Sequence, residues 1–340
     1  MKNIYGLSLE DMEEYFLSIG SKKFHAKQLF EWLYVKRIKS LEEATNIGKD
    51  IQSKILEDYS FSRLKIVEVQ KDVDVCKYLF ELEDGEHIEA VLMMHDFGNS
   101  VCVSSQVGCN MGCKFCESGR RKKVRNLEVY EMVLQILMIE EELGKRVSHV
   151  VVMGIGEPFD NYDNVMKFFT IINSPFGLAI GSRHLTVSTC GVVPKIREFA
   201  NFPLQVNLAI SLHAPNNEIR NKIMPINKVY PLEVLMPALK EYYAKTNRRL
   251  TFEYIMLEGV NDSSENAQEL AKLVKGLNCY INLIPYNETN NIEFKRTNPV
   301  KIMNFYDILK KNNITVTIRR EFGTKISAAC GQLRSKKEEL

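Results

Sequence analysis

The sequence predicts an α/β fold: a partial, six-fold β/α barrel that follows an N-terminal helical domain and a small β-hairpin linker. From residue 101 onward, apolar strand-like segments alternate with amphipathic helical segments, which indicates parallel strands joined by right-handed crossovers. These units are too few for a complete eight-fold barrel. Residues before 63 show helical periodicity. In residues 64–100, apolar and polar residues alternate on either side of the turn signal Glu-Asp-Gly-Glu.

The elements divide the chain into four predicted regions. Residues 1–62 form the helical domain, where Leu29, Phe30, Leu33 and Tyr34 share one helical face and Ser40 to Glu43 match a capping box. Residues 63–100 form the antiparallel linker, residues 101–322 the barrel, and residues 323–340 a C-terminal tail. The barrel strand candidates are VCVSSQ, HVVVMG, HLTVST, QVNLAIS, RLTFEYIM, YINLIPY and ITVTIRR.

The composition of the 340-residue chain is that of a globular protein, with 45% hydrophobic and 26% charged residues. No apolar run approaches the roughly 20 residues of a membrane span, and no export signal is visible, so we expect a cytoplasmic protein without membrane association. The net charge is only +2, but basic residues bunch at 21–23, 36–39 and 120–125. One such run is usually a solvated helix end; three around a candidate site favour a phosphate-rich partner.

Four of the eight cysteines lie within residues 101–119. In a reducing compartment, clustered cysteines indicate metal or thiol chemistry rather than disulfides. Cys109, Cys113 and Cys116 follow a predicted strand with the spacing C-x3-C-x2-C, which suits a four-iron cluster that keeps one iron open. Structural zinc usually needs four ligands in paired arms, so a zinc site completed by a distant residue is the alternative, and simple packing fits less well.

Small polar residues occupy the ends of several predicted barrel strands, where β/α barrels carry their chemistry. The segments are Gly154 to Pro158, Ser188 to Gly191, Ser211 to Pro215 and Pro285 to Asn287. Each alone is compatible with a plain turn, and His213 fits a hydrogen-bonded structural role as well as a ligand role. We interpret Cys190 as a packing residue, and Cys76 and Cys279 as core.

Over nearly its full length the chain resembles the RlmN/Cfr family of radical S-adenosylmethionine RNA methyltransferases. The resemblance rests on the cysteine motif with the preceding C-V-S-S-Q-V-G, and on R-N-L, M-G-x-G-E-P, S-T-x-G-V-V-P, L-A-I-S-L-H-A-P, M-P-I-N, G-V-N-D, N-L-I-P-Y-N and A-A-C-G-Q-L. The last motif is the most specific to this family, and it contains Cys330.

This resemblance implies a radical S-adenosylmethionine barrel that carries a [4Fe–4S] cluster and uses two S-adenosylmethionine molecules per turnover. The implied reaction is methylation of adenosine C2 in 23S ribosomal RNA, and in tRNA for some members. One-electron donors such as flavodoxin or ferredoxin are the implied redox partners, and the implied enzyme is a monomer. The helical domain and residues 120–125 would bind RNA phosphates.

The resemblance also implies a role for each matching residue. The cluster ligands would be Cys109, Cys113 and Cys116. Cys330 would accept a methyl group that is then carried to the adenine as a methylene radical, Cys102 would release the product by forming a disulfide with Cys330, and Glu89 would be the base. The residues implied to bind S-adenosylmethionine are Gly156, Glu157, Ser188, Ser211, Leu212, His213 and Asn287.

Departures from the family pattern keep alternatives open. Glu117-Ser118-Gly119, the basic loop at 120–124 and Phe322 to Ser327 differ from most members, which leaves Cfr-type C8 methylation as an alternative. A cluster- or zinc-stabilised RNA-binding protein without methyl transfer would not need Glu89, Cys102 or Cys330. A radical enzyme acting on a protein or metabolite would not need the helical domain or the tail motif.

Overall fold

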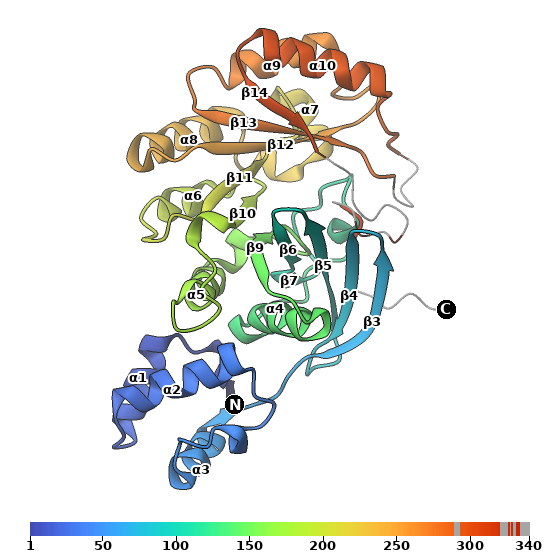
Figure 1. Cartoon of the computed structure of the whole chain (residues 1–340). Helices are drawn as coiled ribbons and strands as arrows, with labels where there is room; N and C mark the ends of the chain where they lie inside the picture. The colour runs from blue at the N-terminus through green and yellow to red at the C-terminus, as the bar shows by residue number, and fades with distance from the viewer. Residues whose placement is uncertain (289–292, 320–325, 327, 329–330, 334–340) are drawn as a thin grey trace.

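A ten-stranded curved sheet forms the centre of the computed structural model, which describes residues 1–288, 293–319, 326, 328 and 331–333. Its strand order is β14-β13-β12-β11-β10-β9-β6-β5-β4-β3 (Figure 1). Strands β6 and β9 to β14 are parallel, whereas β3, β4 and β5 continue the sheet in antiparallel orientation. The described strands of this sheet are β3 (Lys65–Asp72), β4 (Val75–Glu81), β5 (His87–His95), β6 (Gly98–Val103), β9 (Val147–Val152), β10 (Leu185–Thr189), β11 (Asn207–Ser211), β12 (Leu250–Met256), β13 (Cys279–Pro285) and β14 (Thr315–Ile318).

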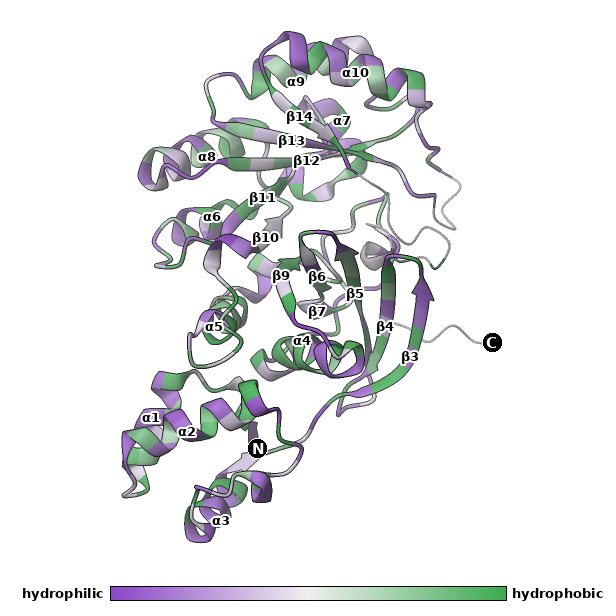
Figure 2. Cartoon of the chain, viewed as in Figure 1, coloured by the Kyte–Doolittle hydropathy of each residue, from purple (hydrophilic) through white to green (hydrophobic). Residues whose placement is uncertain are grey.

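Helices follow the parallel strands and cover the outer face of the sheet, which buries their apolar sides in the main core. In Figure 2 the hydrophobic colour concentrates on the central strands, while the helices are hydrophilic on one side. These helices are α4 (Val129–Leu143), α5 (Tyr162–Asn173), α6 (Val193–Phe199), α7 (Asn217–Ile223), α8 (Leu232–Thr246), α9 (Ser264–Leu273) and α10 (Pro299–Lys311). In the described part of the chain, no helix is both long and apolar enough to cross a bilayer.

The predicted barrel is confirmed. Each of the seven strand candidates forms a strand, and six β/α units lead to the seventh strand, β14, without closing the sheet. The predicted hairpin around residues 83–86 also forms, between β4 and β5. These antiparallel strands do not form a separate unit, however, because Val91 of β5 pairs directly with Cys102 of β6.

The N-terminal segment contains α1 (Leu9–Ser18), α2 (Lys23–Glu31) and α3 (Lys49–Asp58), tied by the short parallel pair β1 (Lys2–Asn3) and β2 (Tyr59–Ser60). The helix predicted to carry Leu29, Phe30, Leu33 and Tyr34 continues from α2 into a π-turn at Trp32–Lys36, after which Arg37 is left-handed. The predicted capping box at Ser40 is present, but it caps only the short 3-10 turn Leu41–Glu43. The segment lies beside α4, where Arg63 forms a 2.7 Å ion pair with Glu141.

Candidate active site

The three clustered cysteines lie on one loop that a small two-stranded ladder closes at its base. Strands β7 (Gln106–Val107) and β8 (Arg125–Asn126) pair antiparallel on either side of it. Gly108 opens the loop with φ of +73°, and a Cβ there would lie 2.4 Å from the carbonyl oxygen of Lys122. Glycine is therefore required at this turn by both conformation and space.

The thiols of Cys109, Cys113 and Cys116 line one pocket at the carboxyl ends of the barrel strands. Burial raises the pKa of Cys109 to about 12 and raises that of Cys113 well above its usual value. Thiolates are therefore costly here unless cationic iron binds them. Buried thiols that share one pocket fit the expected cluster.

The same thiols do not form a site for a single ion. Within the described residues, no three histidine, cysteine, aspartate or glutamate side chains converge closely enough to hold one metal. Tetrahedral zinc needs such convergence, whereas the corners of a four-iron cluster are bound separately. The C-x3-C-x2-C spacing remains the observation that favours the cluster over the zinc alternative.

Glu157 lies in this pocket and is buried, with 3% exposed. Its two carboxylate oxygens accept hydrogen bonds from the backbone N–H groups of Phe159 (2.9 Å) and Cys190 (2.8 Å). Burial raises its pKa despite these bonds. The adjacent Gly156 has φ of +109° and approaches Gln106 too closely to carry a side chain. Because Glu157 lines the pocket, its carboxylate can accept from the amine of S-adenosylmethionine.

His213 follows β11 and is also left-handed, with φ of 57°. Its Nδ1 accepts a 3.0 Å hydrogen bond from the backbone N–H of Ile255, and burial lowers its pKa to about 3. The ring is therefore neutral with its proton on Nε2, and it packs edge-on against Phe115. The structural interpretation of His213 is confirmed by this hydrogen bond. The residue also lines the pocket, and its role as a cofactor ligand stays a prediction.

The remaining predicted cofactor residues divide into two groups. Ser188 and Ser211 line the pocket with their hydroxyls 3.4 Å apart. Leu212 and Asn287 are buried but do not line it, although Asn287 Oδ1 has no hydrogen-bond partner among the described residues. Cys190 lines the pocket, whereas Cys76 and Cys279 are buried in the main core as predicted.

Glu89, the predicted base, and Cys102, the cysteine predicted to release the product, lie on the same inner face of the sheet. Cys102 pairs with Val91, so Glu89 lies diagonally across from it, a separation of roughly 7–8 Å in antiparallel sheets. Glu89 is buried and forms a 3.0 Å ion pair with Lys77 of β4. Neither residue lines the cysteine pocket, but Cys102 packs with Met153, which does.

The predicted methyl acceptor, Cys330, lies outside the described residues, as do most of Phe322 to Ser327. The described tail residues contact the cluster loop at the positions that depart from the family pattern. The backbone N–H of Glu117 donates to Gly331 O (2.8 Å), and Ser118 Oγ donates to Leu333 O (2.9 Å). Gly331 itself lines the pocket.

Sequence reasoning missed four charged residues around the site: Lys77, Arg220, Glu253 and Arg319. Glu253 lines the pocket and stands 3.8 Å from Arg319, which follows β14. Glu253 could have been identified from the sequence, because it is a single charged residue inside the otherwise apolar strand LTFEYIM. Arg220 is completely buried on α7, and nothing in its sequence surroundings marks it.

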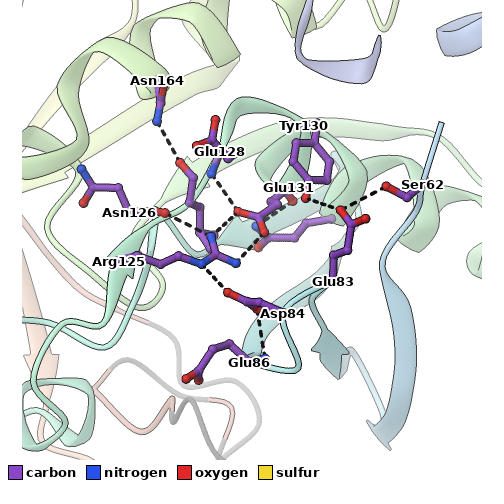
Figure 3. A network of polar contacts seen from close by, with 12 residues as sticks. Ser62, Glu83, Asp84, Glu86, Arg125, Asn126, Glu128, Tyr130, Glu131 and Asn164 are labelled. Carbon is purple, nitrogen blue, oxygen red and sulfur yellow. Dashed lines mark hydrogen bonds and ion pairs between the residues drawn. The ribbon is translucent and has the colours of Figure 1, made fainter. Parts of the chain in front are cut away.

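The basic loop at residues 120–125 is largely neutralised by neighbouring acids. Arg125 binds both carboxylate oxygens of Glu131 at 2.8 Å and Asp84 at 2.6 Å (Figure 3). Arg121 pairs with Glu86 and Lys123 with Asp160. Arg120 and Lys122 are exposed, and Arg120 stands 3.5 Å from Glu117. Only part of this loop thus presents its charge to solvent.

Comparison with known proteins shows that the whole chain is similar to radical SAM RNA methyltransferases. The family model for the ribosomal RNA large subunit methyltransferase N-terminal domain matches residues 2–60, and that for the radical SAM superfamily matches residues 103–271. The probable dual-specificity RNA methyltransferase RlmN of Spiroplasma citri is 55% identical over 342 residues, covering 99% of each chain. That of Enterococcus faecalis is 56% identical, covering 98% of this chain and 96% of the relative. The crystal structure of a radical SAM methyltransferase from Sphaerobacter thermophilus superposes with a TM-score of 0.94 at 40% identity, covering 99% of this chain and 100% of that one.

Proposed function

Because the chain belongs to the RlmN family of radical S-adenosylmethionine RNA methyltransferases, we propose that it methylates adenosine C2 in both 23S ribosomal RNA and tRNA. The observation that carries the proposal is one pocket lined by Cys109, Cys113 and Cys116 together with Glu157 and Gly331. Relatives at 53–56% identity carry the name dual-specificity RNA methyltransferase. Since both RNA classes are cytoplasmic substrates, the proposal places the enzyme in the cytoplasm.

In the proposed site, the three cysteines would hold the [4Fe–4S] cluster, and Glu157 would bind the amine of S-adenosylmethionine. When bound, the cluster supplies the one-electron chemistry that cleaves this cofactor, with electrons from a donor such as flavodoxin or ferredoxin. His213 offers its Nε2–H to the pocket, and Ser188 and Ser211 offer hydroxyl groups. Apolar residues, including Phe115 and Ile255, form part of the pocket wall.

The methyl group would reach the RNA through Cys330, and Cys102 would free the product by forming a disulfide with it. Ring carbons such as adenine C2 are electron-poor, so direct attack on a methylsulfonium is unfavourable. Glu89 would accept the ring proton, and its place diagonal to Cys102 supports a shared working surface. The 3.0 Å pair with Lys77 supports a charged carboxylate, which is the form a base needs.

RNA would be bound through phosphates by the charges that remain exposed. These include Arg120 and Lys122 near the pocket and, on the N-terminal segment, Lys22, Lys36 and Lys39. Lys36 lies 3.4 Å from the ring centre of Trp32, a pairing of cation and aromatic ring that suits nucleotides. The double variant Arg120→Gln/Lys122→Gln is expected to weaken RNA binding. It should also reduce the slope of log affinity against log salt concentration by up to about 2, because two phosphate contacts are lost. Lys240→Gln/Lys245→Gln on α8 is the control, and its RNA affinity should be unchanged.

The experiment that tests the proposed function is mass spectrometry of adenosines in ribosomal RNA and tRNA from cells with and without the gene. The proposal expects 2-methyladenosine to disappear from both RNA classes and to return with the intact gene, but not with Cys330→Ala. Loss of 8-methyladenosine instead would establish the Cfr-type reaction. Unchanged RNA would contradict the proposal.

A further inference from the structure

Arg220 is a buried cation whose hydrogen-bond partners are all neutral. It is 0% exposed and belongs to the short helix α7. Its guanidinium donates to four oxygen atoms, and the acceptors are Asn227 Oδ1 (2.8 Å) and the carbonyl oxygens of Cys190 (2.7 Å), Leu212 (3.2 Å) and Ser211 (3.4 Å). No carboxylate pairs with it in the described part of the chain.

Burying a charge in this way is costly unless an opposite charge lies near. Burial lowers the pKa of Arg220, and the groups that act in the other direction are the thiols of Cys190 and Cys113. The carbonyl oxygens satisfy the donors, but they carry no net charge. An anion close to the guanidinium would offset this cost.

The cluster loop is the place where that anion would appear. The backbone N–H of Lys114 donates to Ile223 O (3.0 Å), which joins the loop to the end of α7. Cys113 and Cys116 pack against the apolar cluster that contains Ile223 and Met224. Arg220 itself bonds to the carbonyl oxygens of Cys190 and Ser211, and both of these residues line the same pocket as the three cysteines. The guanidinium is thus held against the wall of the pocket that would contain the cluster.

We propose that Arg220 is the fixed counter-charge of the iron–sulfur cluster and a positioning residue that raises its reduction potential. The inference rests on the proposed function. A [4Fe–4S]²⁺ core with three thiolates has a net charge of −1, and one electron from the donor protein makes it −2. A nearby cation stabilises the more negative state, and net charge is one of the factors that set such potentials. The four hydrogen bonds hold the cation in place whether or not the cluster is reduced.

A merely structural role for Arg220 is the competing explanation, because the same bonds tie together the ends of β10 and β11. The two roles differ in what each substitution does. Arg220→Lys keeps the charge but loses most of the bonds, whereas Arg220→Gln loses the charge. Asn227→Asp keeps the arginine and places a carboxylate against it, which cancels the charge without opening a cavity.

The test is a redox titration of the anaerobically reconstituted protein, with the reduced cluster followed by electron paramagnetic resonance. We expect a lower potential in Arg220→Gln and Asn227→Asp, and a near wild-type potential in Arg220→Lys. Lys222→Gln is the matched control, because Lys222 lies on the same helix but is exposed and paired with Glu218 at 2.8 Å. Its potential is expected to be unchanged.

An unchanged potential in Asn227→Asp would overturn the proposal, and this variant settles the matter if Arg220→Gln fails to fold. A potential that falls equally in Arg220→Lys and Arg220→Gln would also overturn it, since hydrogen bonding rather than charge would then be responsible. The titration needs no RNA. A protein with the expected potentials that methylates no adenosine would contradict the proposed function alone.

Discussion

Glu157 and Glu89 are nearly equally buried, at 3% and 5% exposed, but they have opposite electrostatic surroundings. Glu157 follows the parallel strand β9 and accepts hydrogen bonds from two backbone N–H groups, with no cation beside it in the described structure. Glu89 lies on the antiparallel strand β5 and faces the ammonium of Lys77. One carboxylate lacks a positive partner and the other already has one.

The difference shows how one sheet provides two kinds of carboxylate. A buried carboxylate without a cation is poised to bind a cationic ligand, because the ligand offsets the cost of burial. A buried carboxylate beside an ammonium stays charged without a ligand and can act as a base. The proposed cofactor binding thus belongs to the parallel part of the sheet, and the proposed proton transfer to its antiparallel extension.

The largest expected effect is on turnover in Glu89→Gln. Loss of a general base lowers the rate by roughly 10²–10⁴-fold, and a protein–RNA adduct should accumulate because the ring proton is not removed. Single-turnover methylation and a nuclease-sensitive gel shift measure the two results. Glu81→Gln, which removes the exposed pair with Lys65, is the control. Normal turnover in Glu89→Gln would end the assignment of Glu89 as the base.

The next effect is on stability in Lys77→Met. This change removes the ammonium that faces Glu89, and breaking a buried pair costs up to about 3–5 kcal/mol. Denaturant unfolding of the apoprotein measures the loss. The double variant Lys77→Met/Glu89→Gln should recover much of it, because no unpaired charge remains. If the double variant is no more stable than Lys77→Met, the pair does not hold the carboxylate as described.

A smaller effect is expected on cofactor affinity in Glu157→Gln. A hydrogen bond to a charged group contributes about 1.5–3 kcal/mol, so S-adenosylmethionine should bind roughly 10- to 100-fold more weakly. Anaerobic equilibrium dialysis measures the dissociation constant. Glu198→Gln, an exposed change on α6, is the control, and Glu89→Gln should bind the cofactor normally. Equal losses in Glu157→Gln and Glu89→Gln would contradict the division between the two carboxylates.

The smallest effect concerns the pH dependence of apoprotein stability. Since the folded pKa of Glu157 is raised, its contribution to stability is present below the ordinary carboxyl pKa and is lost as pH rises through the raised value. Each unit of elevation corresponds to roughly 1.4 kcal/mol. Glu157→Gln should therefore gain stability relative to wild type between pH 4 and pH 8. Melting temperatures of the two apoproteins, measured across this pH range, test the prediction. If they change by the same amount with pH in wild type and in Glu157→Gln, the prediction is refuted.

Much of the fold could be predicted from the sequence, because periodicity and turn residues act locally. The seven barrel strands and the hairpin at residues 83–86 are examples. The continuity of that hairpin with the barrel sheet could not be predicted, since it depends on the pairing of Val91 with Cys102. The π-turn at Trp32–Lys36 was missed for a similar reason, because the apolar pattern continues through it.

In the candidate site, the pocket-lining residues could likewise be predicted from local sequence, but their partners could not. The cysteine spacing and the strand-end motifs identified most residues that line the pocket. The partners of these residues were not visible, because Lys77 and Arg220 become significant only through contacts made by folding. Arg220, for example, bonds to Cys190, which is 30 residues away in sequence. The roles of Glu89, Cys102 and Cys330 remain predictions that the variants above test.

The contacts between the cluster loop and the tail bear on biosynthesis. Ser118 and Leu333 are separated by 215 residues, and Gly331 lines the pocket. On the ribosome, the cysteine loop emerges long before the segment that completes this wall. The wall of the pocket can therefore be completed only after translation has passed residue 331, so the finished site depends on synthesis of nearly the whole chain.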